Sequence, residues 1–323
     1  MRKLLVAVAI AAGLTTLVQE AQAVDWPTKP IEMIGQGAPG GSSDNVWRAI
    51  ADSVAKALGQ QINTTYKPGS GGNIACEYAS HQPADGYTFV IVTIASQGIG
   101  PHLYKNLKYD PINDLTHVAR MTTLPNLLYV NKDFPVNSVK ELIAYAKANP
   151  GKVNYASSGA GTSTHMSAVL FSQQAGVEMA HIPYKASAPA VQGVMTGEAN
   201  ISFENLSAVM PQAIAKTVKP LAITSAQSWA KLPDVPTVAE SGLAGFDVSS
   251  WFGISAPKGT PPEIVDKFSK AVEQALADPA VIERMRTLGA EPAYQNSADF
   301  TAFISAESAR WKPIVELSGA SAE

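Results

Sequence analysis

The sequence predicts an α/β protein built from two domains, each a doubly wound and mainly parallel sheet flanked by helices. Three observations support this class. Short apolar runs of strand character alternate with helical patterns along most of the chain, as in successive βαβ units. The length of 323 residues suits about two domains. Glycine-rich turns follow two of the predicted strands, at the position where doubly wound sheets bind ligands.

The first domain begins with a strand, a helix and two further strands. The helix has its apolar residues on one stripe and ends at Gly59, a residue that favours helix termination. A glycine-rich turn at 68–72 follows the second strand. The expected elements are a strand at 31–34, a helix at 44–58, a strand at 62–66 and a strand at 88–93.

The middle of the chain repeats this alternation, and a capping box at Ser138 and Glu141 opens its first helix. The expected elements after it are a strand at 153–156, a helix at 162–175, a strand at 177–182, a helix at 187–195 and strands at 199–203 and 218–224. The tail is mainly helical in pattern to about Val315, so we assign it to the first domain. The predicted boundaries are 24–123 plus 226–323 for lobe 1, and 124–225 for lobe 2.

Residues 1–23 have the three parts of a cleaved secretory signal. Arg2 and Lys3 form the basic start, residues 4–18 are mostly apolar, and Ala21-Gln22-Ala23 is an A-x-A cleavage site. The apolar run is short for a membrane span of about 20 residues, which leaves a signal anchor as the weaker alternative. No cysteine follows the cleavage site directly, so no lipid anchor is expected. We predict a periplasmic protein that is soluble after cleavage and does not insert into the membrane.

Composition excludes several classes of function. The formal net charge is −3 and no basic run is present, so no nucleic-acid partner is predicted. Cys76 is the only cysteine, which rules out an internal disulfide and leaves a buried helical position as the simplest interpretation. The five histidines show no metal-ligand spacing, and no G-x-S-x-G motif is present. We therefore predict no metal, no cofactor and no enzymatic activity.

Two strand–loop–helix junctions are the strongest candidates for a ligand site. Residues 35–44 and 157–165 each combine glycines with hydroxyl residues at a helix start. Free backbone N–H groups and the positive end of the helix dipole bind anions there, although ordinary helix caps have the same composition. One such loop in each domain favours a shared cleft.

Alternative functions remain open at this point. Residues 35–40 match G-x-G-x-x-G, but Pro39 and two glycines delay the helix, which argues against a dinucleotide site. An exported hydrolase that uses Ser163 or Ser42 with His165 is a second alternative. A sensor for a membrane receptor is a third, and the sequence does not separate it from a transport receptor.

Motifs along the whole predicted mature chain resemble one known family, the periplasmic solute-binding proteins of tripartite tricarboxylate transporters, or Bug family. The matching segments are Trp26-Pro27, Lys29-Pro30-Ile31, Gly40-Gly41-Ser42-Ser43-Asp44, Lys67-Pro68-Gly69-Ser70-Gly71-Gly72-Asn73-Ile74, Pro83-Ala84-Asp85-Gly86-Tyr87-Thr88, Leu103-Tyr104, Tyr155-Ala156-Ser157-Ser158-Gly159, Gly161-Thr162-Ser163-Thr164-His165, His181-Ile182-Pro183-Tyr184-Lys185 and residues 232–240. Their order and number make the resemblance specific.

The resemblance implies a periplasmic-binding-protein fold, with the ligand cleft between two lobes that close by a hinge motion. It implies that both loops hold a carboxylate of the ligand. The implied residues are Pro39, Gly40, Gly41, Ser42, Ser43 and Asp44 in the first loop, and Gly161, Thr162, Ser163, Thr164 and His165 in the second. Less regular positions that could contact the rest of the ligand are Tyr66, Ser96, Gln97, Tyr184, Phe203 and Asn205.

The resemblance also implies partners: a small carboxylate ligand and the membrane permease subunits of such a transporter, with the receptor itself a monomer. Tyr66 stands where the family commonly has asparagine, and it either faces the cleft or packs on the exterior of its lobe. Tyr66, Tyr184 and Phe203 suggest an aromatic dicarboxylate such as terephthalate as one candidate ligand.

Overall fold

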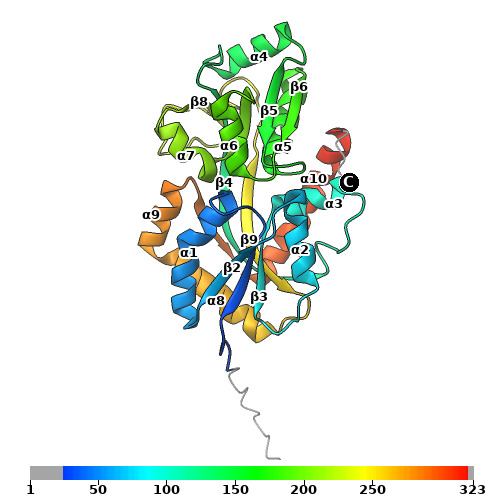
Figure 1. Cartoon of the computed structure of the whole chain (residues 1–323), viewed down its shortest axis with the longest axis vertical. Coiled ribbons are helices and arrows are strands. Elements are labelled where there is room, and N and C mark those ends of the chain that lie inside the picture. The colour runs from blue at the N-terminus through cyan, green and yellow to red at the C-terminus, as the bar shows by residue number, and fades with distance from the viewer. Residues whose placement is uncertain (1–24, 319–323) are drawn as a thin grey trace, which may run out of the picture.

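The computed structural model describes residues 25–318, so the predicted signal at residues 1–23 lies outside the described part of the chain. Within that part the strands join into a 10-stranded sheet in the order β2-β1-β3-β9-β4-β7-β5-β6, with β8 and β10 paired to β4. The sheet divides into two lobes stacked along the long axis of the molecule (Figure 1). The predicted fold class is confirmed.

The first lobe holds parallel strands extended by antiparallel ones. β1 pairs in parallel with β2 and β3, while β9 pairs antiparallel with β3 and β10 antiparallel with β4. The strands span Ile31–Gly35 (β1), Ile62–Tyr66 (β2), Thr88–Thr93 (β3), Ser249–Pro257 (β9) and Glu291–Gln295 (β10). The helical segments before residue 115 are Ser42–Leu58 (α1), Ser70–Gly72 (η1), Asn73–Ser80 (α2), Ile94–Ile99 (η2) and Gly100–Leu103 (α3).

The second lobe is built around β5, which pairs in parallel with β6 and β7. The strands span Val153–Ser157 (β5), Met179–Pro183 (β6), Ile201–Asn205 (β7) and Val218–Ile223 (β8). The helices are Val139–Ala148 (α4), Ser163–Ala175 (α5), Ser187–Thr196 (α6) and Leu206–Ile214 (α7). The predicted cap of α4 is present, since the Ser138 side chain accepts a hydrogen bond from the Glu141 N–H.

One long strand, β4 (Leu115–Asn131), belongs to both lobes (Figure 1). It pairs with β9 from Leu115 to Pro125, and with β7 from Asn126 onward. Its pairing partner therefore changes between two adjacent residues. The boundaries predicted from sequence, at 123/124 and 225/226, stay predictions.

The tail packs on the first lobe through α8 (Pro262–Ala277), α9 (Pro279–Thr287) and α10 (Ser297–Ser318). The prediction of a mainly helical tail left out two strands, because β9 and β10 both lie there. β9 is almost entirely buried, so it lacks the alternation of apolar and polar residues that marks a half-buried strand.

Helix α1 shows how the sequence specifies local structure. Val46, Ile50 and Val54 are fully buried along one stripe, as the helical spacing of apolar residues predicts. The helix ends where Gly59 adopts φ +68° and donates its N–H to carbonyls of the last turn, a left-handed conformation that glycine adopts without steric cost. Together these features fix the direction in which α1 presents its N-terminus.

Cys76 lies in the core of the first lobe. Its side chain is fully buried, and burial raises the pKa of its thiol to about 11. A neutral thiol in this position behaves as a small apolar side chain. Among residues 25–318, no helix is long and apolar enough to cross a membrane.

Candidate functional site

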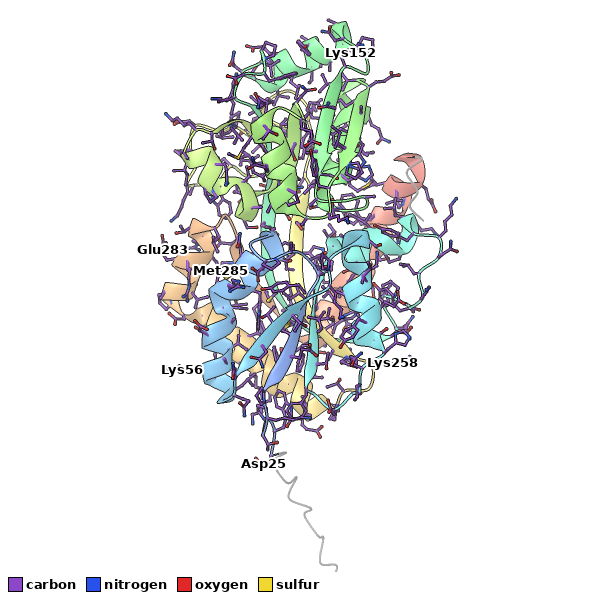
Figure 2. The ribbon with its side chains drawn as sticks, viewed as in Figure 1. Asp25, Lys56, Lys152, Lys258, Glu283 and Met285 are labelled. Atoms are coloured by element: carbon purple, nitrogen blue, oxygen red, sulfur yellow. The ribbon has the colours of Figure 1, made fainter. Side chains whose placement is uncertain are left out.

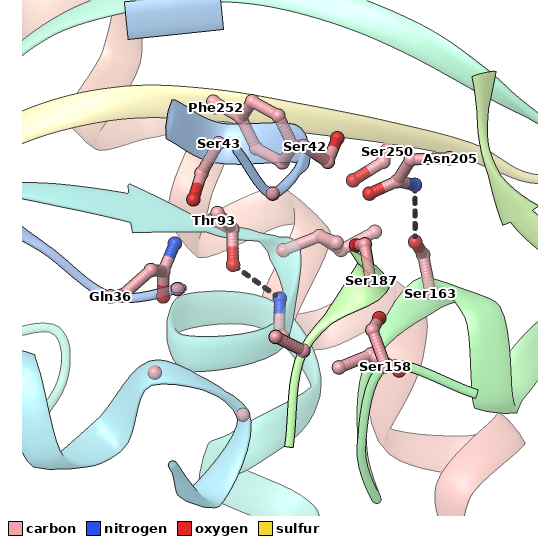
Figure 3. Close-up of a pocket in the computed structure, with 18 of the residues that line it drawn as sticks. Gln36, Ser42, Ser43, Thr93, Ser158, Ser163, Ser187, Asn205, Ser250 and Phe252 are labelled. Atoms are coloured by element: carbon pink, nitrogen blue, oxygen red, sulfur yellow. Dashed lines mark hydrogen bonds between the residues drawn. The ribbon is translucent and has the colours of Figure 1, made fainter. Parts of the chain in front are cut away.

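A pocket lies between the two lobes and has a volume of about 80 Å³. Figure 3 shows residues of both lobes around it. The lining residues are Gln36, Gly37, Gly41, Ser42, Ser43, Gly69, Gly71, Gly72, Thr93, Ile94, Ala95, Ser158, Thr162, Ser163, Lys185, Ala186, Ser187, Asn205, Ser250 and Phe252. The volume is far below the roughly 300–1,000 Å³ of drug-sized pockets, so a small molecule fits best.

The N-termini of three helices converge on this pocket. Residues 41–43 open α1, Thr162 and Ser163 open α5, and Ala186 and Ser187 open α6. Each N-terminus carries unpaired N–H groups and the positive end of a helix dipole. Lys185 is the one charged residue in the lining, and none of the lining residues is acidic. The electrostatic environment therefore favours an anion.

A hydrogen-bond network behind the first loop fixes its shape. Asp44 accepts the Gly40 N–H at 2.7 Å and the Arg48 Nε at 2.8 Å through Oδ2, and the Tyr66 hydroxyl at 2.6 Å through Oδ1. Burial and the bond to Asp44 raise the pKa of Tyr66, which keeps its proton in place. Asp44 and Tyr66 thus support the loop without lining the pocket.

The second loop is held by its own side chains. The Thr162 hydroxyl accepts the His165 N–H at 3.3 Å as the cap of α5, and the Thr164 hydroxyl accepts the Ser158 N–H at 3.0 Å. His165 accepts the Gly161 N–H through Nδ1 at 3.2 Å, and its ring stacks on His181 at 4.2 Å. Burial lowers the pKa of His165 to about 4, so the ring is neutral at physiological pH.

Asn205 extends the site from the end of β7. Its amide donates to the Ser163 hydroxyl at 3.2 Å and also to the Asn126 side-chain oxygen. Asn205 and Ser163 both line the pocket (Figure 3). These contacts place a hydroxyl and an amide side by side at the N-terminus of α5.

The lobes touch each other on both sides of the pocket. The Asn45 side chain donates to the Ser207 carbonyl at 3.1 Å, and the Ser42 and Ser207 hydroxyls are hydrogen bonded. The Tyr104 hydroxyl donates to the Ala160 carbonyl at 3.0 Å. These bonds join residues of the first lobe to residues of the second, which describes a closed arrangement.

Of the residues predicted from the sequence, one group lines the pocket: Gly41, Ser42, Ser43, Thr162, Ser163 and Asn205. Another group lies in the two loops without lining it: Pro39, Gly40, Asp44, Gly161, Thr164 and His165. The loop predictions thus separate into residues that face the pocket and residues that shape its backbone.

The remaining predicted positions lie elsewhere, and Phe203 is the clearest case. It is fully buried against Phe171 in the core, with ring centroids 5.3 Å apart. Ser96 is buried and accepts the Thr93 N–H at 3.2 Å, while Gln97 contacts Cys76. These side chains pack inside their own lobe, because a residue at or after a buried strand can face the core of the lobe as readily as the cleft.

The two tyrosines of the prediction also lie outside the pocket lining. Tyr184 packs beside Gly193 of α6, where an added Cβ would meet its hydroxyl at 2.1 Å. Tyr66 packs on the outer side of α1 with Arg48, which donates to its hydroxyl at 2.9 Å. The sequence left open whether Tyr66 faces the cleft or packs on the exterior of its lobe. In the structure it packs away from the pocket.

Much of the pocket wall lies outside the two loops predicted from the sequence, although Gln36, Gly37 and Ser158 belong to those loops. The lining residues that the sequence did not indicate as part of the site are Gly69, Gly71, Gly72, Thr93, Ile94, Ala95, Lys185, Ala186, Ser187, Ser250 and Phe252. The glycine-rich turn at 68–72 and the helix start at Ser187 were visible signals. Ser250 and Phe252 lie on β9, which the sequence did not reveal.

The two serine–histidine pairs of the hydrolase alternative are not hydrogen bonded in the described part of the chain. His165 Nδ1 accepts the Gly161 N–H, Ser163 contacts Asn126 and Asn205, and Ser42 contacts Ser207. Nor does any group of three or more His, Cys, Asp or Glu side chains within 25–318 have the geometry of a metal site.

A two-lobed α/β fold with a small anion-favouring pocket between the lobes defines a solute-binding architecture. Comparison with protein families agrees with it. The family described as the tripartite tricarboxylate transporter family receptor matches residues 46–320. The chain therefore belongs to this receptor family, whose members are solute-binding receptors and not enzymes.

Relatives cover nearly the whole chain. BugT of Bordetella pertussis is 32% identical over 321 residues, which cover 99% of this chain and 98% of BugT. An R. palustris protein solved with adipate is 37% identical with a TM-score of 0.90, covering 92% and 99% of the two chains. MatC from Rhodopseudomonas palustris with bound malate is 31% identical with a TM-score of 0.84, covering 90% and 100%.

Proposed function

We propose that this chain is a periplasmic receptor that captures a small organic carboxylate between its lobes and delivers it to the membrane permease subunits of a tripartite tricarboxylate transporter. One observation carries the proposal: three helix N-termini and Lys185 surround a pocket whose lining holds no acidic side chain. We propose that the receptor acts as a monomer, as the resemblance in sequence implies.

The groups around the pocket can supply the binding free energy that capture of a ligand requires. Micromolar affinity requires about 8 kcal/mol, and a hydrogen bond to a charged group contributes roughly 1.5–3 kcal/mol. The hydroxyls of Ser42, Ser43 and Ser163 and the Lys185 ammonium supply several donors. Closure of the lobes excludes water and strengthens each of these bonds.

We propose an aliphatic carboxylate as the ligand. The relatives solved with adipate and malate support this class. The aromatic alternative relied on Tyr66, Tyr184 and Phe203, which do not line the pocket. Phe252 is the one aromatic side chain in the lining, so little aromatic surface faces a ligand.

The proposal of a periplasmic location relies on the predicted signal at residues 1–23. Expression of the full chain should yield a periplasmic protein that begins at Val24. N-terminal sequencing of the periplasmic fraction checks this. An uncleaved protein in the membrane fraction would instead support the signal-anchor alternative.

Binding is tested by a thermal-shift screen of mono-, di- and tricarboxylates, followed by calorimetry. The wild type should be stabilised by at least one small carboxylate, and Lys185→Gln should bind it about tenfold more weakly. Lys152→Gln is the matched control, because Lys152 lies at the far end of the second lobe (Figure 2) and should leave affinity unchanged. Binding of no carboxylate, or equal losses in both variants, would refute the assignment.

A further inference from the structure

Gln36 is an unusual member of the pocket wall. It follows β1, lines the pocket and is only 7% exposed. Both of its side-chain atoms, Nε2 and Oε1, are buried and have no hydrogen-bond partner among the described residues. Buried amides in proteins are nearly always paired, because an unpaired one loses its bonds to water without replacement. Water or a ligand must therefore supply the hydrogen-bond partners of these two atoms.

The neighbouring backbone makes room for this amide. Gly72 adopts φ +99°, and a Cβ on it would lie 1.7 Å from the Gln36 Oε1. A residue with a side chain would displace Gln36 from this position. Because Gly72 has no Cβ, the Gln36 amide can pack against the Gly72 backbone at the pocket wall.

The amide also lies away from the main anion-binding groups of the second lobe. Figure 3 shows Gln36 on one side of the pocket and the Ser163–Asn205 pair on the other. Lys185 is the one cation in the lining. A ligand that spans the pocket would thus meet the Ser163–Asn205 pair at one end and the Gln36 amide at the other.

We propose that Gln36 determines specificity by selecting a ligand whose second end is neutral and presents a donor beside an acceptor. A primary carboxamide is the plainest example, since it pairs with Nε2 and Oε1 at once. An ionised carboxylate only accepts hydrogen bonds, so it pairs with Nε2 and leaves Oε1 facing another oxygen. This inference rests on the proposed function and specifies its ligand: a carboxylate at one end and a carboxamide-like group at the other.

The test compares matched acids by calorimetry at neutral pH. Succinamate and succinate differ only in the amide, and glutaramate and glutarate repeat the comparison one methylene longer. The wild type should bind one of the monoamides at least tenfold more tightly than its diacid, because a site built to hydrogen-bond a group discriminates strongly against an analogue that lacks it. Gln36→Leu should bring that ratio close to one.

Gln295→Leu is the matched control. Gln295 lies on β10 of the same lobe and also has an unpaired buried amide oxygen, but it does not line the pocket. Its replacement should keep the wild-type ratio. Gln36→Glu is the second variant at the site: its carboxylate should repel the diacid and preserve the preference for the monoamide, even if Gln36→Leu folds poorly.

Two results would overturn the inference while leaving the proposed function intact. One is a wild type that binds diacid and monoamide equally, and the other is a preference that survives in a folded Gln36→Leu. Failure of the wild type to bind any carboxylate in the wider screen would count against the proposed function itself.

Discussion

Replacement of Gly161 by alanine should weaken ligand binding by opposing closure of the lobes. Gly161 has φ +74°, and a Cβ on it would lie 2.4 Å from Cδ2 of Leu103 in the opposite lobe. Overpacking of this kind costs about 1–3 kcal/mol. If the lobes separate to admit ligand, that cost applies only to the closed state. Since 1.4 kcal/mol corresponds to a factor of ten, affinity should fall about 5- to 150-fold.

Gly176→Ala separates this effect from backbone strain. Gly176 has φ +62° and nothing within 4 Å of an added Cβ, so alanine there carries the left-handed cost of about 1–2 kcal/mol alone. Both variants should lose thermal stability, but only Gly161→Ala should lose affinity in calorimetry. Small-angle scattering should show a larger open fraction for Gly161→Ala with ligand present. Equal affinities of the two variants would refute the reasoning.

Three further results are expected. Tyr104→Phe removes the bond to Ala160 across the lobes and should lower affinity about fivefold by calorimetry; an unchanged Kd would mean the bond does not favour closure. Burial raises the pKa of Glu204 from 4.5 to about 7, so the folded state loses stability as the pH rises between these two values. Glu204→Gln should flatten that part of a plot of Tm against pH. Burial lowers the pKa of His165 to about 4, so the folded state loses stability as the pH drops from about 6.5 to 4. In urea unfolding over that pH range, His165→Gln should lose less free energy of unfolding than the wild type. An identical loss in both would contradict a neutral buried ring.

Much of the fold could be predicted because local patterns determine it. The strands at 62–66 and 88–93 were predicted with the bounds that the structure has, and α1 was placed to within two residues. The strands that the sequence did not reveal are β4, β9 and β10. β4 and β9 are buried on both faces, and their pairing depends on partners far away in the chain, which no local pattern encodes.

Residues of the candidate site could be predicted where they lie at helix starts, but not where tertiary packing decides which way a side chain points. Ser42, Ser43, Thr162 and Ser163 combine helix-start chemistry with a position at the pocket. Phe203 packs in the core and not at the pocket, because a strand residue faces either side of its sheet and the choice depends on which helix covers that side. The resemblance in motif predicted the two loops as the ligand site but gave no information on the orientation of the other side chains.

The strand shared by both lobes constrains how such receptors can be recombined. A chimera that takes one lobe from another family member would have to divide β4 between Pro125 and Asn126, where two hydrogen-bond ladders meet. A slip of one residue at that junction would turn every following side chain to the opposite face. Exchange of whole lobes is thus a poor route to new ligand preference, and substitution within the loops is the safer one.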